Sequence, residues 1–157
     1  MKSVGVNDQS GVAEARRAAT DLAARTGFTE VEIGKLALIT TELSTNLVKH
    51  GSGGEILVGH YEDNDSQGIE IFALDKGAGM RNIAACLEDG YSSAGTAGHG
   101  LGAVVRQSYF VDIGSWPGLG TAVLARVAPG KTAPSTPPTE PTWGGVSIAM
   151  AGETVCG

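Results

Sequence analysis

The stretch TEVEIGKLALITTELSTNLVKHG, from Thr29 to Gly51, predicts the long helix around which the rest of this chain is organised. Thr29 and Glu32 have the spacing of a capping box, in which each side chain accepts a hydrogen bond from the other residue's backbone N–H. Lys49 and His50 place positive character in the last turn, and Gly51 supplies a C-terminal stop. Both ends of the predicted helix are therefore marked.

An apolar stripe with spacings of three and four residues predicts that this helix lies against a core. Its members are Leu36, Ile39, Leu43 and Leu47. Glu42 and Asn46 lie at the border of the stripe, four residues and about one turn apart on a shared face. Taken alone, this pair is more typical of a solvated helix face, since helical Glu and Asn are usually exposed. At the border of a buried stripe, however, it can also line a cleft.

A second motif, DKGAGM, runs from Asp75 to Met80 and follows a strand-like run. The carboxylate of Asp75 only accepts hydrogen bonds, which matches the exocyclic amine of adenine and mismatches the carbonyl of guanine. Gly77 and Gly79 would let the backbone approach a planar ring. The alternative is a glycine-rich turn in which Asp75 is only a turn residue.

A third motif, GHGLG, opens a further predicted helix, so its backbone N–H groups would face an anion at the helix N-terminus. Its residues are Gly98, His99, Gly100, Leu101 and Gly102. A dinucleotide-binding fingerprint is the competing interpretation, with Ala103 in place of its third glycine. That fingerprint directly follows a strand, whereas these glycines follow a loop late in the chain, which argues against it.

Composition excludes several classes of protein. The chain has 157 residues, enough for one domain with a real core, and 17 acidic against 11 basic residues give it a net charge of -6. Nucleic acid is therefore a poor partner. No apolar run is long enough to cross a bilayer, and residues 1–5 hold no signal-peptide stretch, so we expect a cytoplasmic protein. Cys86 and Cys156 are too few for a disulfide framework, and we expect both to be reduced.

The other predicted elements complete a two-layer α+β sandwich, with a mostly antiparallel sheet covered on one face by helices. The predicted helices are Ser10–Arg25, Asn82–Glu88 and Leu101–Ser108, and the predicted strands are Glu55–Tyr61, Ile69–Leu74, Tyr109–Gly114 and Thr121–Val127. The Gly/Ser/Thr-rich loop 89–98 has few apolar anchors, so we expect it to be a lid that orders when phosphates bind.

The chain divides by composition into three parts. Residues 1–128 form the predicted domain, and residues 129–142 are dense in Pro and Thr and predict an extended linker. Residues 143–157 become apolar and strand-like again. They are interpreted either as the start of a truncated following domain or as a strand added to the edge of the main sheet.

The ordered set of three motifs resembles the GHKL ATPase superfamily over most of residues 29–126. The segment DGYSS at 89–93, followed by a short loop and GHGLGA at 98–103, looks like the RsbT-type serine kinases, which are close relatives of the RsbW-type anti-sigma-factor kinases. The resemblance implies the Bergerat fold. Residues 143–157 are similar to the first strand of SpoIIE-type serine phosphatase domains, which occur fused to such ATP-binding domains.

The resemblance also implies roles for individual residues. Glu42 would be the catalytic base and Asn46 the Mg²⁺ ligand, a role that suits Mg²⁺ because it prefers oxygen ligands and keeps several waters. Asp75 would accept the adenine amine, and the closing motif GLGT at 118–121 would bring Thr121 near the same ring. The remaining nucleotide contacts would come from Lys49, His50, Gly77, Gly79, Met80, Gly98, His99, Gly100, Leu101 and Gly102. For Lys49, simple compensation of the helix dipole is the alternative.

The sequence therefore predicts a Mg-ATP-dependent protein serine/threonine kinase. The family resemblance implies that its substrate is a STAS-domain protein, in a partner-switching pathway that controls a sigma factor or a stress response. The alternative is a non-catalytic ATP-binding module that controls an attached serine phosphatase. The identity of the substrate, the direction of regulation and the choice between a monomer and a homodimer stay open at this point.

Overall fold

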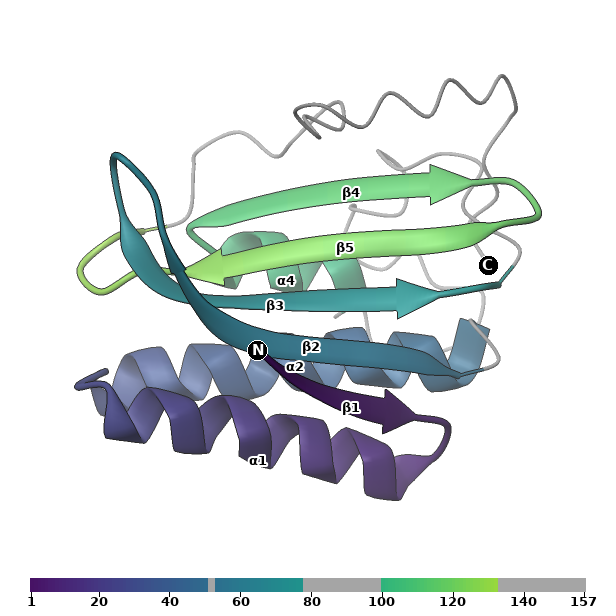
Figure 1. Ribbon diagram of the computed structural model, residues 1–157, viewed down its shortest axis with the longest axis horizontal. Coiled ribbons are helices and arrows are strands. Elements are labelled where there is room, and N and C mark those ends of the chain that lie inside the picture. Colours follow the sequence, from purple (N-terminus) through teal and green to yellow (C-terminus); the bar gives the residue numbers. More distant parts are fainter. Residues whose placement is uncertain (51–52, 78–99, 133–157) are drawn as a thin grey trace.

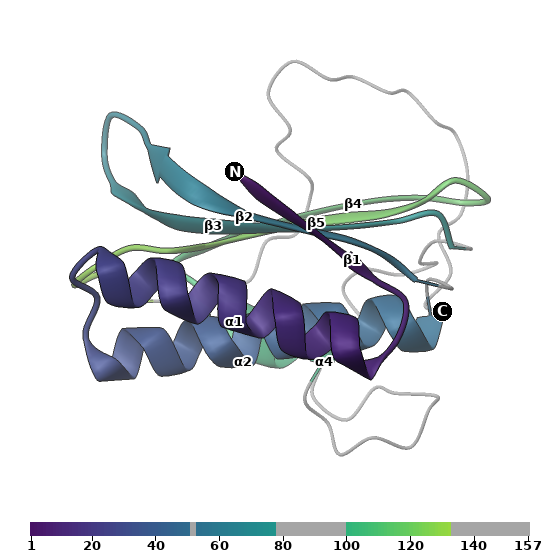
Figure 2. The same cartoon turned by 60° about the horizontal axis from the view of Figure 1, so that its bottom comes forward.

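A computed structural model describes residues 1–50, 53–77 and 100–132, with only the backbone described for His50. Its elements are β1 (Lys2–Val6), α1 (Gln9–Arg25), α2 (Glu30–His50), β2 (Gly54–Glu62), β3 (Gln67–Asp75), α4 (Gly100–Gln107), β4 (Phe110–Trp116) and β5 (Gly120–Val127). The strands form one sheet in the order β1-β2-β3-β5-β4, and every pair is antiparallel. The described helices all lie on one face of this sheet (Figures 1 and 2). The predicted α+β sandwich is confirmed.

The start of α2 has the predicted capping box. The backbone N–H of Thr29 donates to Glu32 Oε2 at 2.8 Å, and the N–H of Glu32 donates to Thr29 Oγ1 at 3.3 Å. The second carboxylate oxygen of Glu32 accepts the N–H of Gly130 at 3.1 Å, which the sequence did not indicate. The N–H groups of Thr29 and Gly130 hold the pKa of the Glu32 carboxyl below its ordinary value. Glu32 therefore joins the start of α2 to the segment after β5.

The predicted apolar stripe of α2 forms the centre of the core. Leu36, Ile39, Leu43 and Leu47 are each at most 3% exposed, and they belong to one cluster with the inward-facing residues of the sheet. Helix α2 contacts both α1 and α4, and it lies between them in Figure 1. Burial of this stripe orients the helix, so Glu42 and Asn46 lie at the side of α2 rather than against the sheet.

Strand β1 was not among the elements predicted from the sequence. Val4 and Val6 point into the core while the other three residues of β1 are exposed, so the strand contributes only two inward side chains. Its position depends on antiparallel pairing with β2, in which Val4 lies opposite Ile56. A Cβ at Gly11 would lie 2.8 Å from the carbonyl oxygen of Gly5, so glycine lets the first turn of α1 pack directly on this strand.

Several predictions concern segments outside the described residues. These are the short helix at 82–88, the lid loop at 89–98, both cysteines, most of the linker and the apolar segment 143–157. The proposed domain boundaries therefore stay predictions. Within the described part of the chain, no helix is both long and apolar enough to span a bilayer.

Candidate active site

Glu42 lies in the middle of α2 and is half-buried. Its Oε2 accepts a hydrogen bond from the backbone N–H of Gly100 at 2.9 Å, across a separation of 58 residues. Gly100 is the first residue of α4 and has a φ of 52°, a left-handed conformation that favours glycine. This contact joins the first and third sequence motifs. Among the described residues, Glu42 Oε1 has no hydrogen-bond partner and is available to a ligand.

Asn46 follows one turn later on the same side of α2 and is half-buried. Its side chain forms no hydrogen bond with another residue of the described ranges, so its amide oxygen is available to a cation or a ligand. Lys49 is exposed near the end of the helix, and His50 is the last helical residue. The amide oxygen of Asn46 is a suitable ligand for Mg²⁺. This ion takes one or two protein oxygens and completes its coordination with water and phosphate.

Asp75 ends β3 and lies opposite Thr121 in the ladder between β3 and β5. Its Oδ1 accepts the N–H of Gly77 at 2.6 Å, while Thr121 Oγ1 lies 2.8 Å from Ser115 Oγ. Thr121 therefore lies beside Asp75, and its contact with the adenine ring stays a prediction. The hydrogen bond to Ser115, which the sequence did not indicate, orients the Thr121 hydroxyl from the neighbouring strand β4.

The second motif lies at the same end of the sheet as the C-terminal half of α2. Asp75 pairs with Gly54, the first residue of β2. A Cβ at Gly54 would lie 2.3 Å from the carbonyl oxygen of Leu74 and 3.0 Å from a side-chain methyl of Leu47, so glycine allows both β3 and α2 to approach the start of β2. Leu47 is adjacent in sequence to Asn46. Asn46 and Asp75 therefore lie toward the same end of the domain.

Four of the predicted site residues, Gly79, Met80, Gly98 and His99, lie outside the described residues. Leu101 and Gly102 are buried in the first turn of α4, so they contribute backbone rather than an exposed side chain to the site. Anion binding by the N–H groups of this turn stays a prediction.

Gly120, beside Thr121, is required by the close approach of two strands. It has a φ of 126°, and a Cβ at this position would lie 2.0 Å from the carbonyl oxygen of Asp75. Any side chain would push the start of β5 away from the end of β3. Gly120 therefore sets the spacing between the strands that carry Asp75 and Thr121.

We expect Gly120→Ala to lower the free energy of unfolding by about 3 kcal/mol or more, because overpacking and positive-φ strain each cost about 1–3 kcal/mol. Gly118→Ala is the matched control. Gly118 also has a positive φ, of 73°, but no atom lies within 4 Å of its would-be Cβ. The control should cost only about 1–2 kcal/mol. Urea denaturation of both variants measures the difference, and equal losses would exclude the steric argument.

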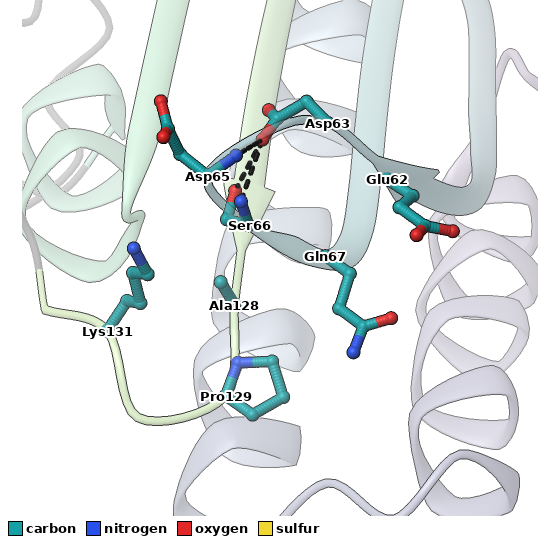
Figure 3. Close-up of a pocket in the computed structure, with 8 residues that line it drawn as sticks. All are labelled: Glu62, Asp63, Asp65, Ser66, Gln67, Ala128, Pro129 and Lys131. Atoms are coloured by element: carbon teal, nitrogen blue, oxygen red, sulfur yellow. Dashed lines mark hydrogen bonds between the residues drawn. The ribbon is translucent and has the colours of Figure 1, made fainter.

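A cleft of about 420 Å³ lies at the other end of the sheet, around the turn between β2 and β3 (Figure 3). It is lined by Glu62, Asp63, Asp65, Ser66, Gln67, Ala128, Pro129 and Lys131. Asp63 Oδ1 accepts the N–H groups of Asp65 and Ser66, and these bonds hold the pKa of Asp63 below its ordinary value. The polar groups here stabilise a turn, and none of the predicted site residues lines the cleft.

Comparison with known proteins adds independent evidence. Residues 6–126 match the family model of the histidine kinase-like ATPase domain. The chain is also 30% identical over 128 residues to the serine/threonine-protein kinase RsbT of Bacillus subtilis (strain 168), a match that covers 76% of this chain and 96% of RsbT. Residues 6–126, which match the family model, contain every described site residue.

Proposed function

Because the chain belongs to the histidine kinase-like ATPase family, in its RsbT-type serine/threonine kinase branch, we propose that it transfers the γ-phosphoryl group of ATP to a STAS-domain protein. The acceptor is a serine or threonine hydroxyl, and the reaction belongs to a partner-switching pathway that controls a sigma factor or a stress response. The observation that carries this proposal is the hydrogen bond between Glu42 and Gly100, which holds a carboxylate at the N-terminus of α4.

The described residues can perform the proton transfer that this reaction needs. As the substrate hydroxyl oxygen bonds to the γ-phosphorus, the bond from that phosphorus to the β–γ bridging oxygen breaks and ADP leaves. The hydroxyl proton passes to Glu42 Oε1, while Oε2 stays bound to the N–H of Gly100. One oxygen thus fixes the orientation of the carboxylate and the other accepts the proton.

Charge neutralisation and positioning complete the proposed mechanism. Asn46 would hold Mg²⁺ through its amide oxygen, and the bound ion would offset the negative charge of the phosphates. The N–H of Gly100 is bound to Glu42, so the other N–H groups in the first turn of α4 would bind the same phosphates. At the other side of the site, Asp75 Oδ2 has no partner among the described residues and would accept the adenine amine, with Thr121 beside it.

A second candidate function follows from the composition after the domain. The Pro/Thr-rich linker and the apolar segment 143–157 favour an ATP-binding module that controls an attached SpoIIE-type phosphatase without phosphorylating anything. Both functions would operate in the cytoplasm, and either is compatible with a homodimer. The nucleotide-binding residues are the same in both, so only transfer of label to a protein separates them.

The test uses the full chain, [γ-³²P]ATP and a panel of purified STAS-domain proteins, with Mg²⁺ and with EDTA. The proposal expects Mg²⁺-dependent labelling of at least one STAS-domain protein on serine or threonine, identified by mass spectrometry. ATP binding without labelling of any panel member would reject the kinase proposal and favour the regulatory module.

Replacement of Asn46 tests the proposed metal ligand. Asn46→Ala should lower the affinity for ATP in the presence of Mg²⁺ by about tenfold or more, the effect of losing one contact to a charged group. Isothermal titration of ATP should show that the parent binds much more tightly with Mg²⁺ than with EDTA. The affinity of the variant should differ little between the two conditions. Gln9→Ala removes an exposed amide at the start of α1 and serves as the control. If the parent binds ATP equally well in EDTA, the ligand assignment is wrong.

A further inference from the structure

The outward side of α2 carries a continuous stripe of solvent-accessible residues with alternating spacings of four and three. The stripe consists of Val31, Lys35, Leu38, Glu42, Thr45 and Lys49. Positions with this spacing lie along one line of a helix. Each member is exposed or half-buried, whereas the core-facing stripe of the same helix is almost fully buried. We call these six residues the α2 outer stripe.

Two large apolar side chains of the α2 outer stripe face solvent. Val31 is 70% exposed and Leu38 is 39% exposed, and they lie seven residues apart on the same line. They are two of the four exposed large hydrophobic residues in the described part of the chain. Single exposed apolar residues are common on protein surfaces. Here, however, Val31 and Leu38 lie on the same line of the helix as Glu42. Leu38 lies one turn before Glu42, about 6 Å away along the helix axis.

The charge of the α2 outer stripe differs from that of the whole chain. Lys35 and Lys49 form no ion pair within the described residues, although the chain carries a net charge of -6. Within the stripe these two lysines outnumber the single carboxylate, Glu42, whereas acidic residues outnumber basic ones in the whole chain. A partner surface that carries apolar side chains and carboxylates would complement the α2 outer stripe. Its carboxylates would attract the lysines and speed association, and its apolar side chains would pack on Val31 and Leu38 and slow dissociation.

We propose that the α2 outer stripe is the docking surface for the protein substrate, an inference that rests on the kinase function proposed above. A substrate must bring a hydroxyl to Glu42, which is itself a member of the stripe. From Val31 to Glu42 the helix extends about 16 Å, longer than a small acceptor molecule and matched by the face of a folded domain. The partner surface that fits is an apolar patch flanked by Asp or Glu, with the acceptor hydroxyl at its Glu42 end.

The test measures phosphorylation kinetics of the full chain with the STAS-domain protein that the panel identifies. Val31→Glu and Leu38→Glu should each raise the KM for that protein about tenfold and leave kcat and ATP affinity within twofold, since an apolar contact of this size is worth about one decade in affinity. Lys35→Glu should also raise KM, and its effect should shrink as salt concentration rises. Ala24→Glu places the same charge on an exposed position of α1 and should change nothing.

Three results would overturn the docking proposal while the kinase proposal stands. The first is an unchanged KM in the Val31→Glu and Leu38→Glu variants, and the second is an equal rise in KM in the Ala24→Glu control. The third is that the parent is a dimer and the stripe variants are monomers in analytical ultracentrifugation, which would assign the stripe to a second copy of the chain. Circular dichroism confirms that the variants are folded. If the parent labels no STAS-domain protein, the kinase proposal fails and the docking proposal fails with it.

Discussion

Replacing Glu42 with glutamine should reduce phosphoryl transfer to the protein substrate by about 10²- to 10⁴-fold, the usual contribution of a general base. Glutamine retains an oxygen that can accept the N–H of Gly100, so the contact between α2 and α4 should persist. It cannot take the proton of the substrate hydroxyl. ATP affinity should therefore stay within a few-fold of the parent, and single-turnover labelling beside nucleotide titration measures both quantities.

Alanine at this position is a less specific test, because it removes the base and the hydrogen bond to Gly100 together. The difference between Glu42→Gln and Glu42→Ala reports what that bond contributes to binding. Glu30→Gln, an exposed change in the first turn of the same helix, is the matched control and should be nearly silent. Undiminished transfer by the Glu42→Gln variant would remove Glu42 from the mechanism.

Asp75→Asn should lower the affinity for ATP by roughly 10- to 150-fold, because a hydrogen bond to a charged group is worth about 1.5–3 kcal/mol. The amide keeps the size of the side chain and can still accept the N–H of Gly77 through its oxygen. Its NH₂ group would then face the adenine amine, opposing two donors. The stability of the domain should change little, because Asp75 is only half-buried at the end of β3.

The same carboxylate predicts discrimination between nucleotides. In bound GTP the carbonyl oxygen of guanine would face the Asp75 carboxylate. Both groups are hydrogen-bond acceptors, so the parent protein should bind GTP poorly. Isothermal titration of ATP and GTP into the parent, Asp75→Asn and the exposed-turn control Asp65→Asn measures both effects. Equal affinities for ATP and GTP in the parent, or no loss in the Asp75 variant, would mean that Asp75 only stabilises its turn.

The sequence alone determined those features of the site that depend on short-range patterns. The capping box, the apolar stripe and the four-residue spacing of Glu42 and Asn46 follow from helix geometry, which repeats every 3.6 residues and is encoded within one segment. The observed helix α2 and its cap confirm the first two. The glycine-rich motifs likewise indicated where the backbone can adopt conformations that favour glycine. Gly100 is an example, because its φ is positive.

The tertiary structure decided which of these local features meet. The contact of Glu42 with Gly100 spans 58 residues, and the pairing of Asp75 with Thr121 depends on the register of two strands that are distant in sequence. Strand β1 and the bond from Gly130 to Glu32 had no local signal. Strand pairing and side-chain contacts between distant segments depend on how the whole chain packs. A single strand considered alone could pair with several other strands, and in more than one register. Local spacing therefore selected the candidate chemical groups, and long-range packing set which of them are in contact.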